Sequence, residues 1–312
     1  MSNPISRRRF LCLAASVVGA PTLARASTPL ASWRGVALGA GASMQLAGVT
    51  QQEADPVFAE IVTEISRLED IFSLYRPHTD VSRLNKTARL DAPAPELLEV
   101  LSIARTVSHS TSGAFNPCIQ PVWQLHAATA GQPSPELLHE ALARSDWRQM
   151  HISASRIYFE TDGMALTLNG IAQGYITDRI SALLRARGFE NVLVNMGEIF
   201  ASGNHPDGTP WSVGIAAPDG RIAASVKLRN RAIATSAPSG TSFDADGLAG
   251  HILDPRTGLS GATQKLVSVS AESACLADAL STAFCLMTTD EIHQTVSRYP
   301  GVRLEQLVTN DI

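Results

Sequence analysis

The segment that decides the fold is Thr167-Leu168-Asn169-Gly170-Ile171-Ala172-Gln173-Gly174-Tyr175, where an apolar, strand-like stretch runs into a helix through two glycines. Apolar spacing predicts that the helix continues from Ile171 to Arg187 and is closed by Gly188, and that Val192-Leu193-Val194 follows as a buried strand. Such a junction presents free backbone N–H groups to an anion and free carbonyl oxygens to a cation. Taken alone, a tight strand-to-helix connection that binds nothing is the commoner explanation.

Strands and helices are interspersed irregularly on both sides of this junction. We expect a strand pair over residues 33–49 and a helix over 55–72. Residues 151–168 are interpreted as a hairpin that turns at Thr161-Asp162-Gly163. No clean strand–helix–strand repeat follows, so the sequence predicts an α+β fold. We expect a single domain of two lobes over residues 27–312, with mixed or antiparallel sheets and flanking helices.

The N-terminus has the pattern of an export signal. Ser6-Arg7-Arg8-Arg9-Phe10-Leu11 is a twin-arginine pattern, an apolar run follows over 10–20, and Ala24-Arg25-Ala26 suits signal peptidase. Residues 1–26 are therefore expected to be a signal peptide that sends the protein to the periplasm by the twin-arginine pathway. A chance arginine pair before a general secretory signal is the alternative.

The charge of the remaining chain limits its partners. The signal segment carries four arginines and no acidic residue, so its removal changes the formal charge from −4 to −8. So acidic a chain is not expected to bind nucleic acid. Cys118, Cys275 and Cys285 remain, and neither their odd number nor their spacing suggests a disulfide scaffold or a zinc site.

Ionisable groups and hard oxygen ligands gather in the C-terminal third. The stretch His251-Ile252-Leu253-Asp254-Pro255-Arg256-Thr257-Gly258 is forced into a turn by its proline and glycine. Further on, Asp278 and Thr282 stand four residues apart in an apolar, helix-like run, so their oxygens project from one face, where a hard cation can be held. His251 alone is more often a packed, hydrogen-bonded residue. Near a metal-bound phosphate, it can accept a proton from an attacking hydroxyl.

Two other short segments carry little information alone. Ser112-Gly113-Ala114-Phe115-Asn116-Pro117 is expected to end a helix in a turn with an exposed aromatic ring and an amide. Ser73-Leu74-Tyr75 is compatible with an ordinary core edge. Only the combination of all these segments makes them informative.

Taken in order, the segments resemble the ApbE family, the FAD:protein FMN transferases. Each motif is weak alone, but eight in the right order cover nearly all of residues 33–290. The matching segments are Gly35 to Ala40, Ser73-Leu74-Tyr75 with Ser82-Arg83-Leu84-Asn85, Gly113 to Pro117, Leu168 to Asp178, Val194 to Gly197, Ala234-Thr235-Ser236, His251 to Gly258, and Ala277 to Thr282. The twin-arginine signal, with Leu38-Gly39-Ala40 where most members have Met-Gly-Thr, is similar to the NosX-type branch.

The resemblance implies a reaction and its site. FAD is cleaved at its pyrophosphate, the FMN half is joined to a Thr or Ser hydroxyl of a partner protein, and AMP is released, with Mg²⁺ neutralising charge. The implied metal ligands are the Gly170 carbonyl, Asp278 and the Thr282 hydroxyl, and His251 is the implied base that acts with Asp278 in catalysis. The residues implied to contact FAD are Leu38, Tyr75, Ala114, Phe115, Asn116, Thr167, Gln173 and His251.

The resemblance also implies the kind of partner. The acceptor would carry a Ser/Thr-Gly-Ala-Thr-like motif. The NosX-type branch is linked to maturation of the nitrous-oxide-reduction system, which points to a membrane-bound NosR-type electron-transfer protein as the acceptor.

Several positions depart from the family pattern. Thr167 and Asn116 stand where Asp is usual, Gln173 where Lys is frequent, and Glu198 where a second Gly after Gly197 is common. Neutral hydrogen bonds are weaker than charge-assisted ones, so these departures are expected to alter the affinity for the nucleotide. Two alternatives therefore stay open: a pyrophosphatase that hydrolyses FAD to FMN and AMP, and a non-catalytic periplasmic FAD-binding assembly factor.

Overall fold

The computed structural model describes residues 28–217, 220–247 and 249–310, so the expected signal peptide, residues 1–26, lies outside the described residues. The α-helices are α1 (Gln51–Phe72), α2 (Asp80–Thr87), α3 (Pro95–Ser110), α4 (Gln120–Ala128), α5 (Pro135–Ala143), α6 (Ala172–Ala186), α7 (Ala274–Phe284) and α8 (Thr289–Val296). The strands are β1 (Leu30–Ala37), β2 (Ala40–Ala47), β3 (Arg89–Asp91), β4 (Met150–Ser153), β5 (Arg156–Phe159), β6 (Val192–Asn195), β7 (Ile199–Ser202), β8 (Trp211–Ala216), β9 (Ile222–Leu228), β10 (Arg231–Ser236), β11 (Gln264–Ala271) and β12 (Arg303–Thr309).

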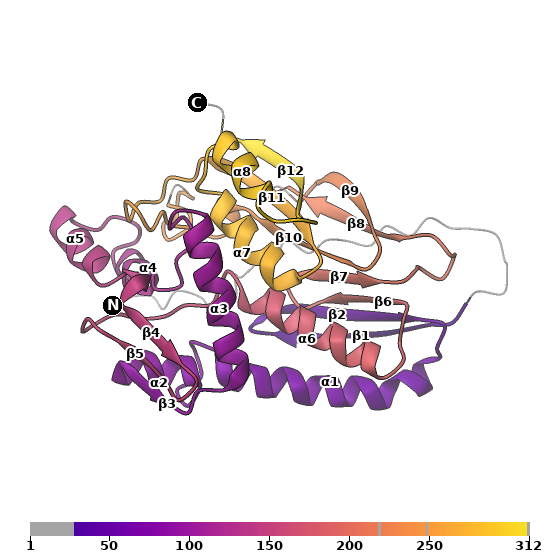
Figure 1. Ribbon diagram of the computed structural model, residues 1–312. Coiled ribbons are helices and arrows are strands. Elements are labelled where there is room, and N and C mark those ends of the chain that lie inside the picture. The colour runs from indigo at the N-terminus through magenta and orange to yellow at the C-terminus, as the bar shows by residue number, and fades with distance from the viewer. Residues whose placement is uncertain (1–27, 218–219, 248, 311–312) are drawn as a thin grey trace.

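Seven strands form one antiparallel sheet in the order β1-β2-β6-β7-β10-β11-β12. Its centre joins distant parts of the chain, because Met44 of β2 lies opposite Val194 of β6 and Ile199 of β7 lies opposite Ile233 of β10. Strands β3, β5 and β4 form a second sheet, and β8 and β9 pair as a ribbon. Figure 1 shows helices packed along the sheets, so the α+β fold with antiparallel sheets and flanking helices is confirmed.

Both faces of the large sheet are buried. Side chains of β6 alternate between them: Val192 and Val194 enter the main hydrophobic core, whereas Leu193 enters a smaller core on the opposite face. Helices α6 and α7 cover the main core, and α1 and α3 pack against them (Figure 1). The smaller core lies under the β8–β9 ribbon, where Trp211 is fully buried. The main core also contains Ile157 of the small sheet, so the two sheets share one core.

The hairpin expected over 151–168 is wrong in its turn and in its second arm. The chain turns between β4 and β5, where the Ser153 hydroxyl accepts a hydrogen bond from the Arg156 N–H at 3.1 Å. Residues 164–168 form no strand, because the Asn85 side chain bonds both the carbonyl and the N–H of Leu166, at 2.8 and 2.6 Å. A side chain thus replaces the partner strand that the alternating pattern suggested.

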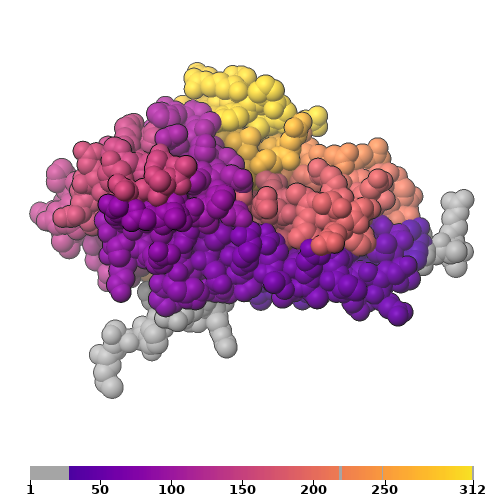
Figure 2. Space-filling view, turned by 60° about the horizontal axis from the view of Figure 1, so that its bottom comes forward, coloured from indigo at the N-terminus to yellow at the C-terminus, as the bar shows by residue number. Residues whose placement is uncertain are grey.

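The surface is assembled from distant parts of the chain. In Figure 2 the indigo residues of the N-terminal part lie against salmon residues from the middle of the chain, in agreement with the packing of α1 on α6.

No helix in the described part of the chain is both long enough and apolar enough to cross a membrane.

Candidate active site

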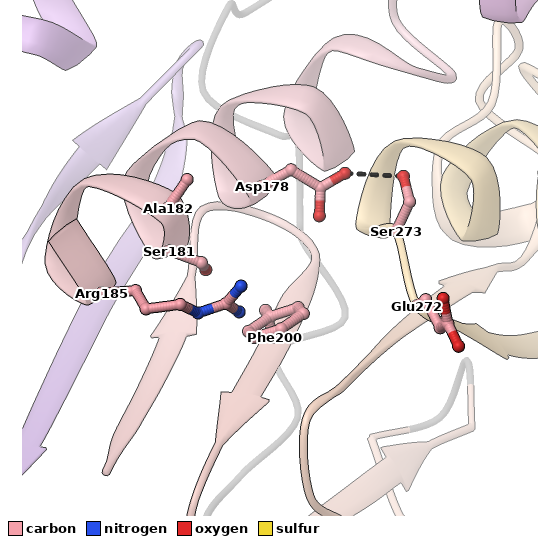
Figure 3. A pocket seen from close by; sticks show the side chains of 7 residues that line it. All are labelled: Asp178, Ser181, Ala182, Arg185, Phe200, Glu272 and Ser273. Carbon is pink, nitrogen blue, oxygen red and sulfur yellow. Dashed lines mark hydrogen bonds between the residues drawn. The ribbon is translucent and has the colours of Figure 1, made fainter. Parts of the chain in front are cut away.

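The candidate site is built where α6 packs against α7. Gly174, in the first turn of α6, lies so close to α7 that a Cβ there would be 2.4 Å from the Ala274 carbonyl oxygen. One turn further along α6, the Asp178 carboxylate accepts hydrogen bonds from the Ser273 hydroxyl and from the N–H groups of Ala274 and Cys275, at 2.7, 2.7 and 3.0 Å. Asp178 therefore caps the N-terminus of α7, as its contact with Ser273 in Figure 3 shows. These contacts fix the position of α7 on α6.

Asp278 and Thr282 of α7 face the start of α6. The Asp278 carboxylate, in a residue that is 4 % exposed, accepts a hydrogen bond from the Gly174 N–H at 3.1 Å. A Cβ on Gly170 would lie 2.9 Å from the Thr282 hydroxyl oxygen, so this hydroxyl lies directly against the Gly170 backbone. The structure therefore groups Gly170, Asp278 and Thr282 around the start of α6.

The donor set at this point suits a hard cation. A backbone carbonyl, a carboxylate and a hydroxyl are oxygen ligands of the kind that Mg²⁺ prefers. In the described part of the chain no group of three His, Cys, Asp or Glu side chains is placed to hold a metal. A cation bound to these residues would therefore depend on backbone and hydroxyl oxygens as well as on Asp278.

Two carboxyl groups near this point, those of the buried Asp278 and the partly exposed Glu198, have raised pKa values. Burial raises the pKa of Asp278 to about 7. The hydrogen bond from the Gly174 N–H lowers this pKa, whereas the charge of Asp178 raises it. Burial, and then the charge of Asp278, raise the pKa of Glu198 well above its usual range, while the Thr235 backbone lowers it. No lysine, arginine or histidine of the described residues is among the groups that shift these two pKa values. Buried carboxyls in such surroundings are protonated or bound to a metal.

The raised pKa of Asp278 predicts that the metal-free protein loses stability as the pH rises from about 4 to about 7. The unfolded carboxyl ionises near 3.8 and the folded one near 7, so its contribution is fully present below about 3.8 and is lost as the pH rises through about 7. Thermal midpoints measured in chelator at several pH values between these limits test this. The Asp278→Asn variant should lack this part of the pH dependence, and an identical dependence in both proteins would contradict the assignment.

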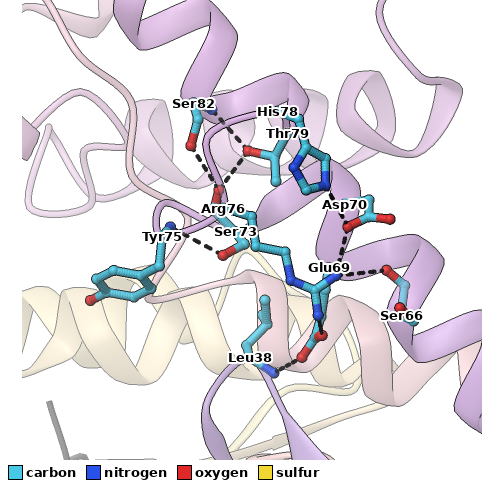
Figure 4. Close-up of polar contacts among 10 residues, drawn as sticks. All are labelled: Leu38, Ser66, Glu69, Asp70, Ser73, Tyr75, Arg76, His78, Thr79 and Ser82. Carbon is cyan, nitrogen blue, oxygen red and sulfur yellow. Dashed lines mark hydrogen bonds and ion pairs between the residues drawn. The ribbon is translucent and has the colours of Figure 1, made fainter.

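Leu38 and Tyr75 are held at the same end of α1 (Figure 4). The Leu38 N–H donates to the Glu69 carboxylate at 2.7 Å, and Glu69 forms an ion pair with Arg76. The Tyr75 N–H donates to the Ser73 hydroxyl at 3.1 Å, and the tyrosine is 66 % exposed. The turn between β1 and β2 is thus joined to the loop after α1, with an accessible aromatic ring beside it. Such a ring can stack on a flat ligand.

The turn after α3 differs from the sequence expectation. Ala114 and Phe115 are 2 % and 5 % exposed, so the expected exposed aromatic is wrong: the phenyl ring packs in the main core. The Asn116 side-chain N–H donates to the Ser145 carbonyl at 2.7 Å, and its side-chain oxygen accepts from the Cys118 N–H at 2.8 Å. Both halves of the amide are engaged in the fold. This pairing gives a structural reason for an amide at a position where Asp is usual.

Replacing Asn116 with aspartate is expected to destabilise the fold by about 1–3 kcal/mol at neutral pH, because a carboxylate cannot donate to the Ser145 carbonyl that it would face. Urea unfolding of both proteins measures the change. The loss should shrink in acid, where a protonated carboxyl can again donate. An unchanged urea midpoint at neutral pH would contradict the proposed role of the amide.

Thr167 lies in the extended segment that leads into α6, and Gln173 lies in the first turn of that helix. The Thr167 N–H donates to the Pro117 carbonyl at 2.7 Å, which places the junction beside the turn that contains Asn116. The Gln173 side chain lies against Gly197, where a Cβ would be 2.5 Å from it and where φ is +111°. A side chain at residue 197 would therefore be strained and would displace Gln173.

The His251 turn is fixed by backbone acceptors and by an ion pair. His251 Nδ1 lies 3.2 Å from the Pro238 carbonyl and 3.1 Å from the Thr241 carbonyl, so Nδ1 carries the proton and Nε2 keeps its lone pair. Burial lowers the pKa of His251, against the two backbone hydrogen bonds, which raise it. Asp254 pairs with Arg256 at 2.8 Å, and Arg256 also donates to the Leu286 carbonyl, in the turn after α7, at 2.6 Å. Asp254 thus shapes the turn and ties it to α7.

Sequence reasoning missed two acids that build this site. Asp178 lies at the end of a matched segment, but its capping role depends on the packing of α6 against α7. Glu198 was visible only as a departure from a family pattern, and its proximity to Asp278 depends on long-range strand pairing.

Comparisons with known proteins agree on one family. The model of the ApbE family matches residues 38–304. A FAD:protein FMN transferase of Treponema pallidum is 31 % identical, with 80 % of this chain and 76 % of the relative covered, and one of Salmonella typhimurium is 24 % identical, with 93 % and 89 % covered. Among solved structures, the flavin transferase ApbE of Vibrio cholerae superposes with a TM-score of 0.80 at 24 % identity, covering 91 % and 95 % of the two chains. The ApbE protein of Thermotoga maritima gives 0.75 at 26 %, covering 90 % and 97 %.

Proposed function

This chain belongs to the ApbE family, and from that premise we propose that it is a FAD:protein FMN transferase. The reaction cleaves the pyrophosphate of FAD, joins the FMN phosphate to a Ser or Thr hydroxyl of a partner protein, and releases AMP. The observation that carries the proposal is the grouping of Gly170, Asp278 and Thr282, since it supplies hard oxygen ligands beside a backbone junction suited to phosphate chemistry.

The residues present fit a magnesium ion. The Gly170 carbonyl, the Asp278 carboxylate and the Thr282 hydroxyl would hold it, and Asp178 and Gly174 hold α7 in the position that these ligands need. When bound, Mg²⁺ would neutralise charge on the pyrophosphate oxygens. Phosphoryl transfer then depends mainly on how the chain positions the donor and the acceptor hydroxyl.

His251 is the base of the proposed mechanism. Its Nδ1 proton is committed to two backbone carbonyls, so the ring is held in one orientation with the lone pair of Nε2 available. Nε2 takes the proton of the acceptor hydroxyl as that oxygen bonds to the FMN phosphorus. The bond between this phosphorus and the AMP oxygen breaks, and AMP leaves with the bonding electrons. Burial lowers the pKa of the ring, which keeps it neutral and ready to accept the proton near neutral pH.

We predict that His251→Gln lowers the transfer rate by roughly 10²–10⁴-fold, because glutamine cannot accept the proton. The wild-type rate at saturating metal should rise with pH and level off below the ordinary histidine pKa, and the variant should lack this rise. Single-turnover rates measured across pH check both points. His139→Gln, at an exposed position on α5, is the matched control and should leave the rate unchanged. A variant at the wild-type rate would remove His251 from the mechanism.

An in-gel assay tests the function itself. The purified chain is mixed with FAD, Mg²⁺ and an acceptor protein that carries a Ser/Thr-Gly-Ala-Thr-like motif, and the denatured acceptor is examined for flavin fluorescence. A fluorescent acceptor and one AMP per flavin transferred are expected. FMN release without an acceptor would instead favour hydrolysis, and tight FAD binding without AMP would favour a carrier.

The proposal extends to location and partner. The twin-arginine pattern of residues 1–26 supports export to the periplasm, and the NosX-like features support a NosR-type acceptor in nitrous-oxide-reductase maturation. Replacing Arg7 and Arg8 by lysine and fractionating the cells tests the first point, since the variant should remain in the cytoplasm. Flavin fluorescence on the NosR-type protein, present with this chain and lost without it, tests the second.

A further inference from the structure

Glu198 lies at the point where the large sheet meets α6. Its backbone carbonyl accepts a hydrogen bond from the Thr177 hydroxyl of α6 at 3.0 Å. The next residue, Ile199, pairs with Ile233, so Glu198 stands at the end of β7 beside β10, where the Thr235 backbone interacts with its carboxyl. Side chains alternate along a strand, and Ile199 enters the smaller core, so the Glu198 side chain lies on the opposite face of the sheet, which α6 and α7 cover.

The last residues of β10 contact α7 through hydroxyl groups. The Ser236 hydroxyl lies 2.7 Å from the Ser281 hydroxyl and 3.4 Å from the Thr282 hydroxyl. Ser281 in turn donates to the Asp278 backbone carbonyl at 3.0 Å. The Glu198 carboxyl, the Asp278 carboxyl and the Thr282 hydroxyl therefore surround one region between β10, α6 and α7. Glu198 and Thr282 are partly exposed, so part of this region is accessible to solvent.

When both carboxyls are ionised, this region carries two negative charges. The proposed ligand set of Gly170, Asp278 and Thr282 carries one negative charge, whereas a divalent cation carries two positive charges. Glu198 and Asp278 together would match it, and no basic side chain of the described residues shifts the pKa of either. Asp178, the other acid nearby, is already satisfied by three donors at the N-terminus of α7.

We infer that Glu198 supplies the second negative charge of the divalent-cation site, next to the ligands Gly170, Asp278 and Thr282. The inference rests on the proposed function for the site itself and adds a residue that the sequence pattern did not assign. In the metal-free protein the two carboxyls repel each other, and the bound cation removes that repulsion. Because Glu198 lies where β7, β10 and α7 meet, a cation held by Glu198 and Asp278 would connect these three elements.

Direct metal binding tests the inference without any transfer assay. Mg²⁺ titrations by calorimetry, and Mn²⁺ titrations by electron paramagnetic resonance, compare the wild type with E198Q and with E272Q, a matched change at an exposed glutamate just before α7. We expect E198Q to weaken both metals by about 10–100-fold and E272Q to leave them unchanged. At pH values above neutral and without metal, E198Q should have a higher thermal midpoint than the wild type, because one of two facing charges is gone.

The outcomes distinguish the role of Glu198 from the presence of the cation site itself. Metal binding by E198Q within about twofold of the wild type, with binding lost in D278N, would overturn the role of Glu198 and leave the proposed site intact. Unchanged binding in D278N as well would overturn both. A weakened E198Q that gains thermal stability when metal-free supports the inference, because a merely unfolded variant would lose that stability.

Discussion

Replacing Asp278 with asparagine will lower FMN transfer by about 10³-fold or more. The amide oxygen can still accept the Gly174 N–H, so the packing of α6 on α7 is kept, while the charged metal ligand is lost. Metal neutralisation of a phosphoryl group contributes several kcal/mol to transition-state stability, and each 1.4 kcal/mol is about tenfold in rate. Transfer rates at increasing Mg²⁺ concentration measure the loss.

A second aspartate provides the control. Asp290, exposed in the first turn of α8, is changed to asparagine in the same way and should keep the full rate. A D278N protein that folds, binds FAD and transfers FMN at the wild-type rate would remove Asp278 from the proposed metal site.

Gly174→Ala will cause the largest loss of stability, about 3 kcal/mol, because the new methyl group would meet backbone atoms that cannot move aside. Its Cβ would lie 2.4 Å from the Ala274 carbonyl oxygen, 2.6 Å from the carbonyl carbon and 2.7 Å from the Cys275 Cα. Overpacking of this kind typically costs 1–3 kcal/mol or more, which lowers the thermal midpoint by roughly 5–10 °C in a chain of this size. Calorimetry measures the shift. Transfer activity should fall as well, since α7 must move away from α6.

Gly41→Ala is the matched control. This glycine lies in β2, and a methyl group added to it would have nothing within 4 Å, so the substitution should leave the midpoint almost unchanged. Equal midpoints for Gly174→Ala and the wild type would show that the two helices can separate without cost, and the role of their contact would have to be abandoned.

The sequence predicted the elements whose stability is local. The helix over 55–72 was recognisable by its apolar spacing, although it begins at Gln51, because Thr50 and Glu53 form a capping box that the spacing does not include. α4 (Gln120–Ala128) was missed: it is a short helix whose burial depends on other parts of the chain. The extended segment at Leu166 was misread as a strand because a distant asparagine, not a neighbouring strand, satisfies its backbone.

The same distinction holds for the site. Asp278 and Thr282 could be paired from their four-residue spacing, because helix geometry alone places them on one face. The contact of Gly170 with Thr282 spans more than a hundred residues, and only the family resemblance pointed to it. Glu198 reaches the site through the pairing of β7 with β10, and no local pattern encodes which strands become neighbours.

The strand order of the large sheet also governs when the protein can become active during its synthesis. β2 can pair with β6 only after about 150 further residues have been synthesised, and β7 can pair with β10 only later still. α7 follows all four strands in the chain, so it can pack on the sheet only after they have been made. A nascent chain that has not yet produced α7 therefore contains the first half of the cation site without the second. Folding of this sheet is expected to be slow and late, and partly synthesised chains will expose unpaired strand edges that chaperones must cover.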